Sequence, residues 1–393
     1  MATSYITRYL EKNLGEYLDS FPVITITGPR QSGKTTLIKR YFSDYAYFSL
    51  EYYDVRSMAE KDPNAFLNHD KRGMILDEVQ NLPLLMSYIQ GIVDENPDRR
   101  FVLSGSSQFA LMKQVSQSLA GRTAVLELLP FSCNEICDSL SQLSLDKILI
   151  NGFYPAVYSG RSKPHLLYPS YIKTYLERDV RNLLNIKDMS MFRTFMSLCA
   201  GRVGKLFNAS ELSCELGVSA NTIKSWLSVL QASYIVFMLP PYFANVEKRL
   251  VKTPKLYFYD TGIVCSLLGI ETEQQLMYNR MRGSIFENFI VSEVVKYRFN
   301  NGKSNNLMFY RDSNGVEIDL LLPNGDKYCG LEIKSSQTYN TDFEKGFYHA
   351  DVKLIDKMPC KAVVYSGTLK NDISDIKLLN YINLYSLLNN FYI

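Results

Sequence analysis

The stretch that decides the fold reads Gly28-Pro29-Arg30-Gln31-Ser32-Gly33-Lys34-Thr35 and fits the pattern G-x-x-x-x-G-K-[ST] in full. An apolar run at residues 23–27 predicts a strand before it, and a helical pattern with Leu37 and Ile38 follows it. A glycine-rich turn between a strand and a helix points its backbone N–H groups inward, where the helix N-terminus adds partial positive charge. The sequence therefore predicts a loop that cradles phosphates.

Two side chains of this loop carry most of its expected chemistry. Lys34 would reach the β- and γ-phosphates of a nucleotide, and the Thr35 hydroxyl would ligate Mg²⁺. The predicted ATP-binding residues are Gly28, Pro29, Arg30, Gln31, Ser32, Gly33, Lys34, Thr35, Thr36 and Asp77. ATP and Mg²⁺ are therefore the expected cofactors.

A second apolar run, at residues 74–76, ends in the acidic pair Asp77 and Glu78. Asp77 would hold the Mg²⁺ ion together with Thr35, mostly through water, because Mg²⁺ keeps part of its hydration shell. Glu78 would orient and deprotonate the attacking water. The competing interpretation is a helix cap after a strand, but the complete phosphate loop upstream favours the catalytic one.

A third predicted strand, at residues 101–103, ends in hydroxyl side chains. Ser104 or Ser106 would sit beside the γ-phosphate as a sensor, although a simple polar strand end is nearly as good an interpretation. Arg122 follows Gly121 and is a candidate arginine finger, with Arg178 as the other candidate and an ordinary surface arginine as the alternative. A finger that acts in trans would require a homo-oligomer.

Composition narrows the remaining possibilities. A chain of 393 residues is long enough for two or three domains. Its 43 basic and 40 acidic residues give a net charge of only +3, so any DNA binding needs a local basic patch. Seven scattered cysteines without a C-x-x-C pair predict reduced thiols and a cytoplasmic location. No signal peptide is visible at residues 1–14, and the longest apolar stretch, 234–243, contains two prolines and is too short to span a membrane. No His/Cys cluster has zinc spacing.

Four short segments together resemble a family of prokaryotic AAA+-type ATPases that carry a C-terminal domain of unknown function. They are residues 27–35, 76–80, 103–107 and 119–122. Residues 152–155 and 171–180 resemble the middle segment of the same family, so the similarity covers nearly the whole chain. The resemblance implies an ATP-binding core and a winged helix, and it implies no settled biological role.

The middle of the chain predicts a helix-turn-helix. Residues 210–216 form a short helical pattern that Gly217 ends, and Ser219 caps a second helix at residues 220–232. Residues 234–239 and 255–259 would form the wing of a winged helix. Lys248, Arg249 and Lys252 lie near its tip, where they would contact DNA phosphates. The outer face of the second helix has one lysine and no arginine, so a role in packing or protein contacts is as good an interpretation.

The C-terminal part carries carboxylates on two apolar strands around an Asn-Gly turn. If the loop has an even number of residues, the turn predicts a register that pairs Asp319 with Gly330 and Glu317 with Glu332, whereas a loop of odd length would turn one strand's side chains to the other face. Asp319, Glu332 and Lys334 would then share one face, and Gly330 would leave room for an ion. Glu287, on the preceding helix, would add a ligand. This order of Glu, Asp and Glu-x-Lys resembles the PD-(D/E)XK nuclease fold, in which carboxylates hold Mg²⁺ and the lysine positions or activates water.

These features predict an α/β multidomain chain. Its expected parts are an AAA+-like P-loop domain with a parallel sheet (1–140), a helical lid or linker (141–200), a winged helix-turn-helix (201–270) and a PD-(D/E)XK nuclease-like α/β domain (271–393). The expected function is an Mg²⁺-dependent ATPase that acts on or binds DNA, with possible metal-dependent cleavage. The alternative is a slow ATP-dependent switch that recognises DNA or a protein without cutting. A transporter- or kinase-type P-loop protein is disfavoured because no membrane segment or acceptor site is recognisable.

Overall fold

The computed structural model describes residues 5–392, except for 107–110, 112–114, 116, 177–188, 243–252, 370 and 374. The chain forms two compact units. The first comprises Met1–Phe131, Ala232–Tyr234 and Arg298–Lys303, and the second comprises Ser132–Gln231, Ile235–Tyr297 and Ser304–Ile393. Among the described residues no helix combines the length and the apolar character needed to cross a membrane.

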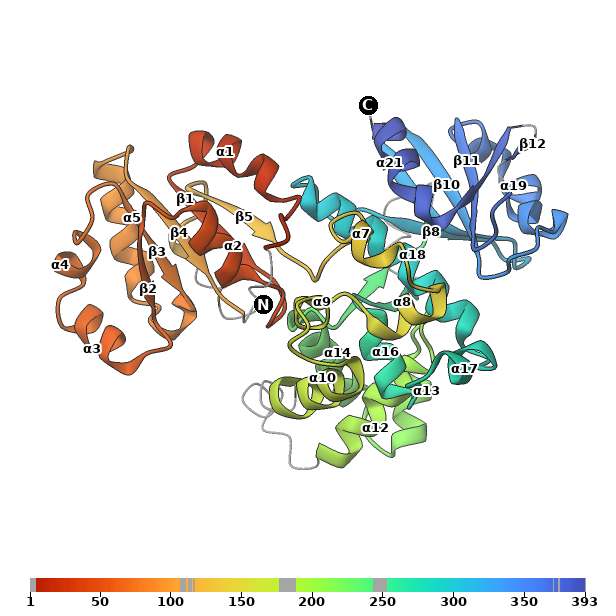
Figure 1. The fold of residues 1–393 in the computed structure, drawn as a ribbon, viewed down its shortest axis with the longest axis horizontal. Helices are drawn as coiled ribbons and strands as arrows, with labels where there is room; N and C mark the ends of the chain where they lie inside the picture. Colours follow the sequence, from red (N-terminus) through yellow and green to blue (C-terminus); the bar gives the residue numbers. More distant parts are fainter. Residues whose placement is uncertain are drawn as a thin grey trace. The chain divides into compact units, whose positions relative to one another are not determined.

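A parallel five-stranded sheet in the order β2-β3-β4-β1-β5 forms the centre of the first unit (Figure 1). Its strands are β1 (Val23–Thr27), β2 (Ala46–Ser49), β3 (Gly73–Asp77), β4 (Arg100–Ser104) and β5 (Thr123–Glu127). Its helices are α1 (Glu11–Ser20), α2 (Lys34–Tyr41), α3 (Tyr53–Lys61), α4 (Pro63–Leu67) and α5 (Leu85–Glu95), with a 3₁₀ turn at Val79–Asn81. The three strands that the sequence predicts are confirmed.

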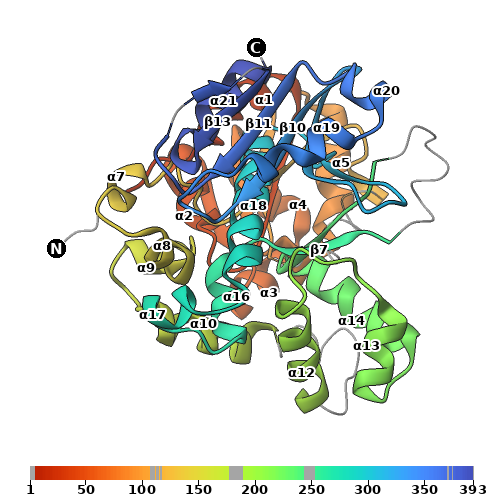
Figure 2. The ribbon, with the colours of Figure 1, turned by 90° about the vertical axis from the view of Figure 1, so that its right-hand side faces the viewer.

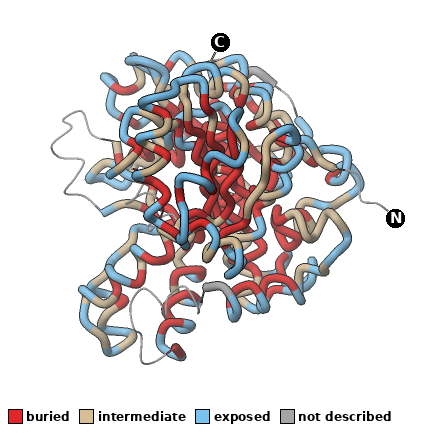
Figure 3. The backbone as a smooth tube through the Cα atoms, turned by 90° about the vertical axis from the view of Figure 1, so that its left-hand side faces the viewer, coloured by how far each residue is buried: buried red, intermediate tan, exposed pale blue. Residues whose placement is uncertain are grey.

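Alternating strand residues bury both faces of this sheet. Ile24 and Ile26 pack with α1 and α2, whereas Val23 packs with α3, α4 and α5 on the opposite face. Figure 3, in which buried residues are red, shows the strands as the buried centre under more exposed helices. The continuous apolar runs in the sequence therefore reflect strands that are covered on both faces. The carboxyl ends of the strands are the part of the sheet that these helices leave uncovered.

The second unit begins with helices and continues into a two-stranded hairpin. The helices are α7 (Cys137–Leu140), α8 (Leu145–Asn151), α9 (Pro155–Tyr158), α10 (Pro164–Tyr171), a π-helical turn (Ile172–Leu176), α12 (Met189–Ala200), α13 (Ala209–Leu216) and α14 (Ala220–Ala232). The antiparallel strands β6 (Val236–Leu239) and β7 (Lys255–Phe258) follow. Gly217 ends α13 with a φ of 65°, and Ser219 accepts a hydrogen bond from Thr222 N, as the sequence predicts.

A six-stranded mixed sheet in the order β12-β13-β11-β10-β9-β8 forms the C-terminal part (Figure 2). Its strands are β8 (Met308–Arg311), β9 (Glu317–Asn324), β10 (Lys327–Lys334), β11 (Cys360–Tyr365), β12 (Asn371–Ile373) and β13 (Ile376–Asn380). The helices are α16 (Thr261–Leu267), α17 (Glu273–Met277), α18 (Arg282–Asn300), α19 (Lys345–His349), α20 (Val352–Ile355) and α21 (Leu384–Tyr392), with 3₁₀ turns at Thr341–Glu344 and Tyr381–Asn383.

The predicted register of the β9–β10 hairpin is wrong by two residues. Asn324 pairs with Lys327, and Gly330 pairs with Leu321 rather than with Asp319. The two central turn residues are Gly325 and Asp326, so Asn324 belongs to the strand. Gly325 takes the first central position with a φ of 64°, which is where a type II′ turn requires glycine. A shift of two residues keeps each side chain on its predicted face.

Candidate nucleotide site and carboxylate cluster

The loop between β1 and α2 has the backbone that its glycines predict. Gly28 has a φ of 144°, Gln31 of 61° and Gly33 of 98°. A Cβ atom on Gly28 would lie 2.2 Å from the carbonyl oxygen of Leu128, so only glycine fits there. Lys34 is the first residue of α2. The loop therefore curls over the N-terminus of a helix at the open edge of the parallel sheet.

Lys34 is buried inside this loop. Its Nζ donates to the carbonyl oxygens of Gly28, at 2.9 Å, and Pro29, at 2.8 Å. Burial lowers the pKa of Lys34 to about 8, since the nearby carboxylates Glu78 and Asp77 offset only part of the desolvation. Within the described residues, the buried hydroxyls of Thr27 and Ser32 have no hydrogen-bond partner. A triphosphate and its Mg²⁺ ion fit these residues, because phosphate oxygens would satisfy both the ammonium and such hydroxyls.

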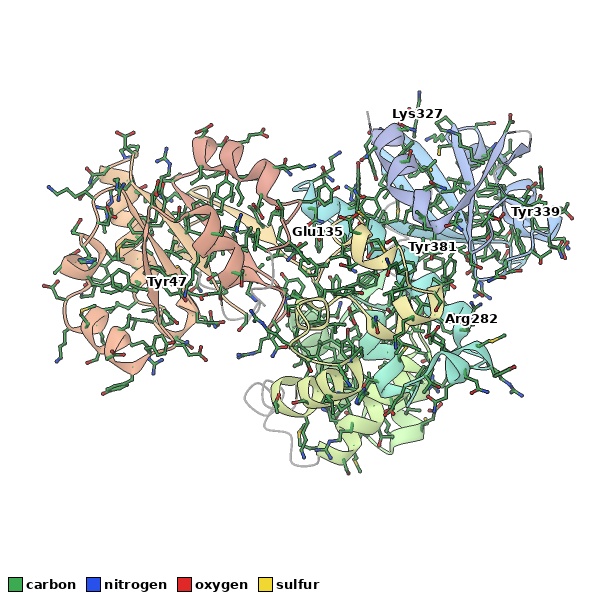
Figure 4. All side chains as sticks on the ribbon, in the orientation of Figure 1. Tyr47, Glu135, Arg282, Lys327, Tyr339 and Tyr381 are labelled. Atoms are coloured by element: carbon green, nitrogen blue, oxygen red, sulfur yellow. The ribbon has the colours of Figure 1, made fainter. Side chains whose placement is uncertain are left out.

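Asp77 collects hydroxyl donors from three other elements. Its Oδ2 accepts from Thr35 Oγ1 at 2.8 Å and from Tyr47 OH at 2.8 Å, and its Oδ1 accepts from Ser104 Oγ. Figure 4 labels Tyr47 on β2. Thr35 and Asp77 are thus brought together as the Mg²⁺ prediction requires, and Ser104 contacts the carboxylate. Neither Tyr47 nor its strand, β2, was predicted from the sequence.

Glu78 follows β3 in a left-handed backbone conformation with a φ of 54°. Its Oε2 accepts from Gln80 Nε2 at 2.5 Å and from Ser106 Oγ at 3.0 Å. Ser106, one of the two candidate phosphate sensors, therefore contacts the candidate general base. These two hydrogen bonds hold the carboxylate in one place.

Arg8 supports the phosphate loop and was missed by the sequence analysis. Its guanidinium is buried and donates to the carbonyl oxygens of Ser32, at 2.8 Å, and Leu129, at 2.7 Å. The same group lies over the Phe131 ring, 4.9 Å from its centroid. Arg8 therefore fixes the loop to the segment after β5. This role of Arg8 could not be predicted, because a single arginine far from the motif forms no recognisable sequence pattern.

Arg122 lies away from the nucleotide loop. It immediately precedes β5, and its carbonyl oxygen accepts from Val23 N at the start of β1, whereas the loop follows the other end of β1. Its guanidinium forms two hydrogen bonds to Asp94, at 2.6 and 2.8 Å. Arg122 therefore does not lie near the nucleotide loop of its own chain. Arg178, the other candidate finger, lies outside the described residues.

The C-terminal carboxylates gather around two lysines. Lys334 Nζ lies 2.8 Å from Glu332 Oε2 and 3.2 Å from Asp319 Oδ2. The backbone N–H of Ile333 also donates to Asp319, at 2.8 Å. The predicted grouping of Asp319, Glu332 and Lys334 is therefore present despite the shifted register, because parity alone decides the face.

Lys255, from β7, contributes the second lysine. Its Nζ lies 2.5 Å from Glu317 Oε1 and 3.3 Å from Glu287 Oε1. Tyr257 OH donates to Glu287 Oε1 at 2.5 Å. A bridge between Pro241 and Phe309, with a hydrogen bond from Tyr242 N to the Phe309 carbonyl oxygen, joins the chain beyond β6 to the edge strand β8. The hairpin thus supplies a charge that the sequence analysis did not assign to this site.

Arg282, labelled in Figure 4, fixes the N-terminus of α18, the helix that carries Glu287, on two sides. Arg282 Nε binds Asp146 Oδ1 at 2.8 Å, and its Nη1 donates to the Ser335 carbonyl oxygen at 3.1 Å. Asp146 belongs to α8, and Ser335 directly follows β10. Arg282 therefore connects the helical segment, α18 and the end of the strand that carries Glu332.

Burial and mutual repulsion shift the pKa values in this cluster. Burial, and then the neighbouring Asp319, raise the pKa of Glu332 to about 9 and that of Glu287 above its ordinary range. Burial would also raise the pKa of Asp319, but the ammonium groups of Lys334 and Lys255 hold it below its ordinary value. The carboxyl groups of this cluster outnumber its lysines, so their negative charges are only partly balanced.

The surroundings of Gly330 and of the carboxylates differ from what the predicted metal site requires. A Cβ on Gly330 would lie 2.5 Å from Met358 Sδ and 2.8 Å from Phe347, so this glycine makes room for core side chains rather than for an ion. Across the described ranges, no three His, Cys, Asp or Glu residues form a group arranged to hold a metal ion. Lysine ammonium groups occupy the space between the carboxylates instead.

Three family models match the chain. One describes an AAA domain and matches residues 20–137, and the others describe domains of unknown function, DUF8612 at residues 142–274 and DUF4143 at 282–385. Uncharacterized proteins of Mycobacterium bovis and Mycobacterium tuberculosis are each 30% identical over 361 residues, which cover 90% of this chain and 78% of theirs. The chain belongs to their family, a family of AAA+-type ATPases.

Other proteins are similar to this AAA+-type ATPase at lower sequence identity. An uncharacterized protein of Methanocaldococcus jannaschii is 21% identical over 376 residues, 87% of this chain and 81% of that protein. Among solved structures, a Walker-type ATPase of Pyrococcus abyssi is 15% identical with a TM-score of 0.45, and covers 66% of this chain and 94% of its own. DnaA from Aquifex aeolicus, bound to AMPPCP, is 16% identical with a TM-score of 0.31 and covers 56% and 85%.

Helix α14 of this AAA+-type ATPase presents a polar surface. On α14, Ile223, Trp226 and Leu230 are buried, and Phe192 and Phe195 of α12 pack on the Trp226 ring. Exposed polar side chains on the other face are Asn221, Lys224, Ser225 and Ser228. The predicted wing residues Lys248, Arg249 and Lys252 lie outside the described residues. The described face is thus polar and carries one positive charge.

Proposed function

We propose that this AAA+-type ATPase hydrolyses ATP at residues 28–36 and uses the cycle to act on DNA. The observation that carries the first part is the convergence of Lys34, Thr35, Asp77 and Glu78 at one edge of the parallel sheet. Mg²⁺ bound with the nucleotide neutralises phosphate charge in such sites. Lys34 binds the β- and γ-phosphates, Thr35 and Asp77 hold the ion, and Glu78 accepts a proton from the attacking water.

The test separates nucleotide binding from hydrolysis. Lys34→Ala should abolish both, because it removes the ammonium inside the loop. Glu78→Gln should still bind ATP but retain it unhydrolysed, since an amide cannot accept the proton. Phosphate release and retention of radiolabelled ATP on a filter measure the two steps. ATP turnover by Lys34→Ala would overturn the proposal, and rapid hydrolysis by Glu78→Gln would remove Glu78 from the role of base.

We infer that the C-terminal domain is a PD-(D/E)XK nuclease-like domain that contacts DNA. What supports this is the convergence of Glu287, Asp319, Glu332 and Lys334 from α18, β9 and β10 in the order typical of that fold. In that fold, carboxylates hold a metal ion and a lysine positions water, whereas here Lys255 and Lys334 lie between the carboxylates. Nicking of supercoiled plasmid with Mg²⁺ or Mn²⁺, with and without ATP, tests cleavage. Nicking by the wild type and not by Asp319→Ala supports it; intact plasmid throughout opposes it.

One observation favours a second candidate, a switch that binds DNA or a protein without cutting. Lys255 and Lys334 already neutralise part of the carboxylate charge that a metal ion would need. This candidate predicts that Asp319→Ala retains every activity and that DNA affinity depends on the nucleotide. Equal DNA binding with ATP, with ADP and with neither would refute it.

We also propose that Arg122 acts in trans, on the nucleotide of a second copy of this chain. Its position beside the start of β5, away from the loop of its own chain, supports a trans role over a cis one. Light scattering with ATP and the Glu78→Gln variant tests for the oligomer. An ATPase rate that does not change on Arg122→Ala would refute the role, with Arg72→Ala as the matched exposed control.

A further inference from the structure

Two cysteines of the C-terminal sheet lie side by side on neighbouring strands. Cys329 on β10 and Cys360 on β11 are direct partners in the parallel register. Their sulfur atoms are 2.6 Å apart, with the Cys329 thiol donating to Cys360. Neighbouring strands lie about 4.7–4.9 Å apart, which falls within the Cα separation of about 4.4–6.8 Å that a disulfide spans. Register alone therefore places the pair at a distance that a disulfide can bridge.

The two thiols differ in ways that suit oxidation in a defined order. Cys329 is buried, whereas Cys360 is partly exposed at the start of β11. The hydrogen bond from Cys329 lowers the pKa of the Cys360 thiol, and the nearby Lys377 ammonium lowers it further, although burial opposes both. Cys360 is thus the thiol that a small oxidant can reach, and it is the one that more readily forms a thiolate.

We propose that Cys329 and Cys360 form a reversible, peroxide-sensitive disulfide that joins β10 to β11. The Cys360 thiolate attacks one oxygen of hydrogen peroxide; an S–O bond forms, the O–O bond breaks and hydroxide leaves, taking up a proton as water. The Cys329 sulfur then attacks the Cys360 sulfur, the S–S bond forms and the S–O bond breaks with loss of a second water. The two cysteines are oxidised by two electrons in total, and the peroxide is reduced.

The position of the pair gives the disulfide a structural consequence. Strand β10 also carries Glu332 and Lys334, three and five residues beyond Cys329. Oxidation would attach this strand covalently to β11 and prevent the two from separating. The inference rests on strand register and thiol exposure, and it stands whether or not the carboxylate cluster binds a metal or cuts DNA.

The test uses the full chain in its native state. Brief treatment with hydrogen peroxide, then unfolding, alkylation and mass spectrometry, should show the loss of two hydrogens and one crosslinked peptide pair containing Cys329 and Cys360. Dithiothreitol should restore both alkylated peptides. Cys360→Ser should abolish the crosslink, and Cys214→Ser, at an exposed cysteine elsewhere, should leave it intact.

Other outcomes would overturn the proposal. Full alkylation of both cysteines after peroxide, a crosslink to another cysteine, or a crosslink between chains would each do so. Cys329→Ser should also abolish the crosslink; should it fail to fold because that site is buried, Cys360→Ser decides the question, since the Cys360 side chain is partly exposed.

Discussion

Lys255→Met tests whether Lys255 balances the charge of the carboxylate cluster. Methionine has a similar length and no charge, so the substitution removes the ammonium while filling most of its space. Lys255 is 3% exposed and contacts Glu317 at 2.5 Å and Glu287 at 3.3 Å. Removal of one partner from a buried ion pair costs about 3–5 kcal/mol, because the remaining charges stay buried without compensation. We expect the free energy of unfolding at pH 8 to fall by that amount.

The expected loss depends on pH. Burial and Asp319 raise the pKa of Glu287 already, and without Lys255 it should rise further. When the pKa of a carboxyl group is higher in the folded than in the unfolded state, its contribution to stability is largest at pH values below the unfolded pKa. That contribution is lost as the pH rises through the folded pKa. The deficit of Lys255→Met should therefore shrink between pH 8 and pH 5.

The assay is urea unfolding followed by the fluorescence of Trp226, the single tryptophan of the chain, which is buried on α14. Lys224→Met, at an exposed lysine on the same helix, is the control and should change stability by less than about 0.5 kcal/mol. Adding Glu287→Gln to Lys255→Met should recover about 1 kcal/mol or more. A loss below about 1 kcal/mol at pH 8, or an equal loss at both pH values, would refute the reasoning.

Three further outcomes are expected. Because burial lowers the pKa of Lys34 to about 8 and bound phosphates favour its charged form, ATP binding at pH 8 should take up about half a proton; calorimetry in buffers of different ionisation enthalpy measures this, and no uptake would contradict it. Gln80→Leu removes one hydrogen bond that positions the Glu78 carboxylate, worth about 1 kcal/mol, so kcat should fall by up to about fivefold in a phosphate-release assay; an unchanged or higher kcat would show that Gln80 does not position the base. The pKa of Glu332 is raised to about 9 by burial and Asp319, so this group's contribution to stability is lost as the pH rises from about 4.5 to 9. Glu332→Gln should flatten that slope in urea unfolding at pH 5 and pH 8.5, and an unchanged slope would contradict the shift.

Local patterns predicted much of the fold of the first unit. Strands β1, β3 and β4 were found because each is a short apolar run covered on both faces and followed by a recognisable end. Strands β2 and β5 were missed, since polar and half-buried positions interrupt their apolar patterns. The phosphate loop was predictable in full, because its chemistry depends on residues that are adjacent in the chain.

In the C-terminal site, too, contacts within one hairpin were predictable and contacts between distant segments were not. Side-chain parity placed Asp319, Glu332 and Lys334 on one face, and a register wrong by two residues did not alter this. The identity of the turn residues was ambiguous, because both Asn-Gly and Gly-Asp suit a two-residue turn. Lys255 could not be predicted at all, since it lies on a different hairpin, more than sixty residues from Asp319 in the sequence.

By itself, the sequence determined the nucleotide loop, the acidic end of β3 and the alternation of the C-terminal strands. These depend on neighbours in the chain, where covalent geometry fixes which residues can meet. Only the tertiary structure decided that Arg8 and Tyr47 support the nucleotide site, that Lys255 enters the carboxylate cluster, and that Cys329 meets Cys360. Such contacts join distant segments, and they form only when burial of the apolar faces brings those segments together.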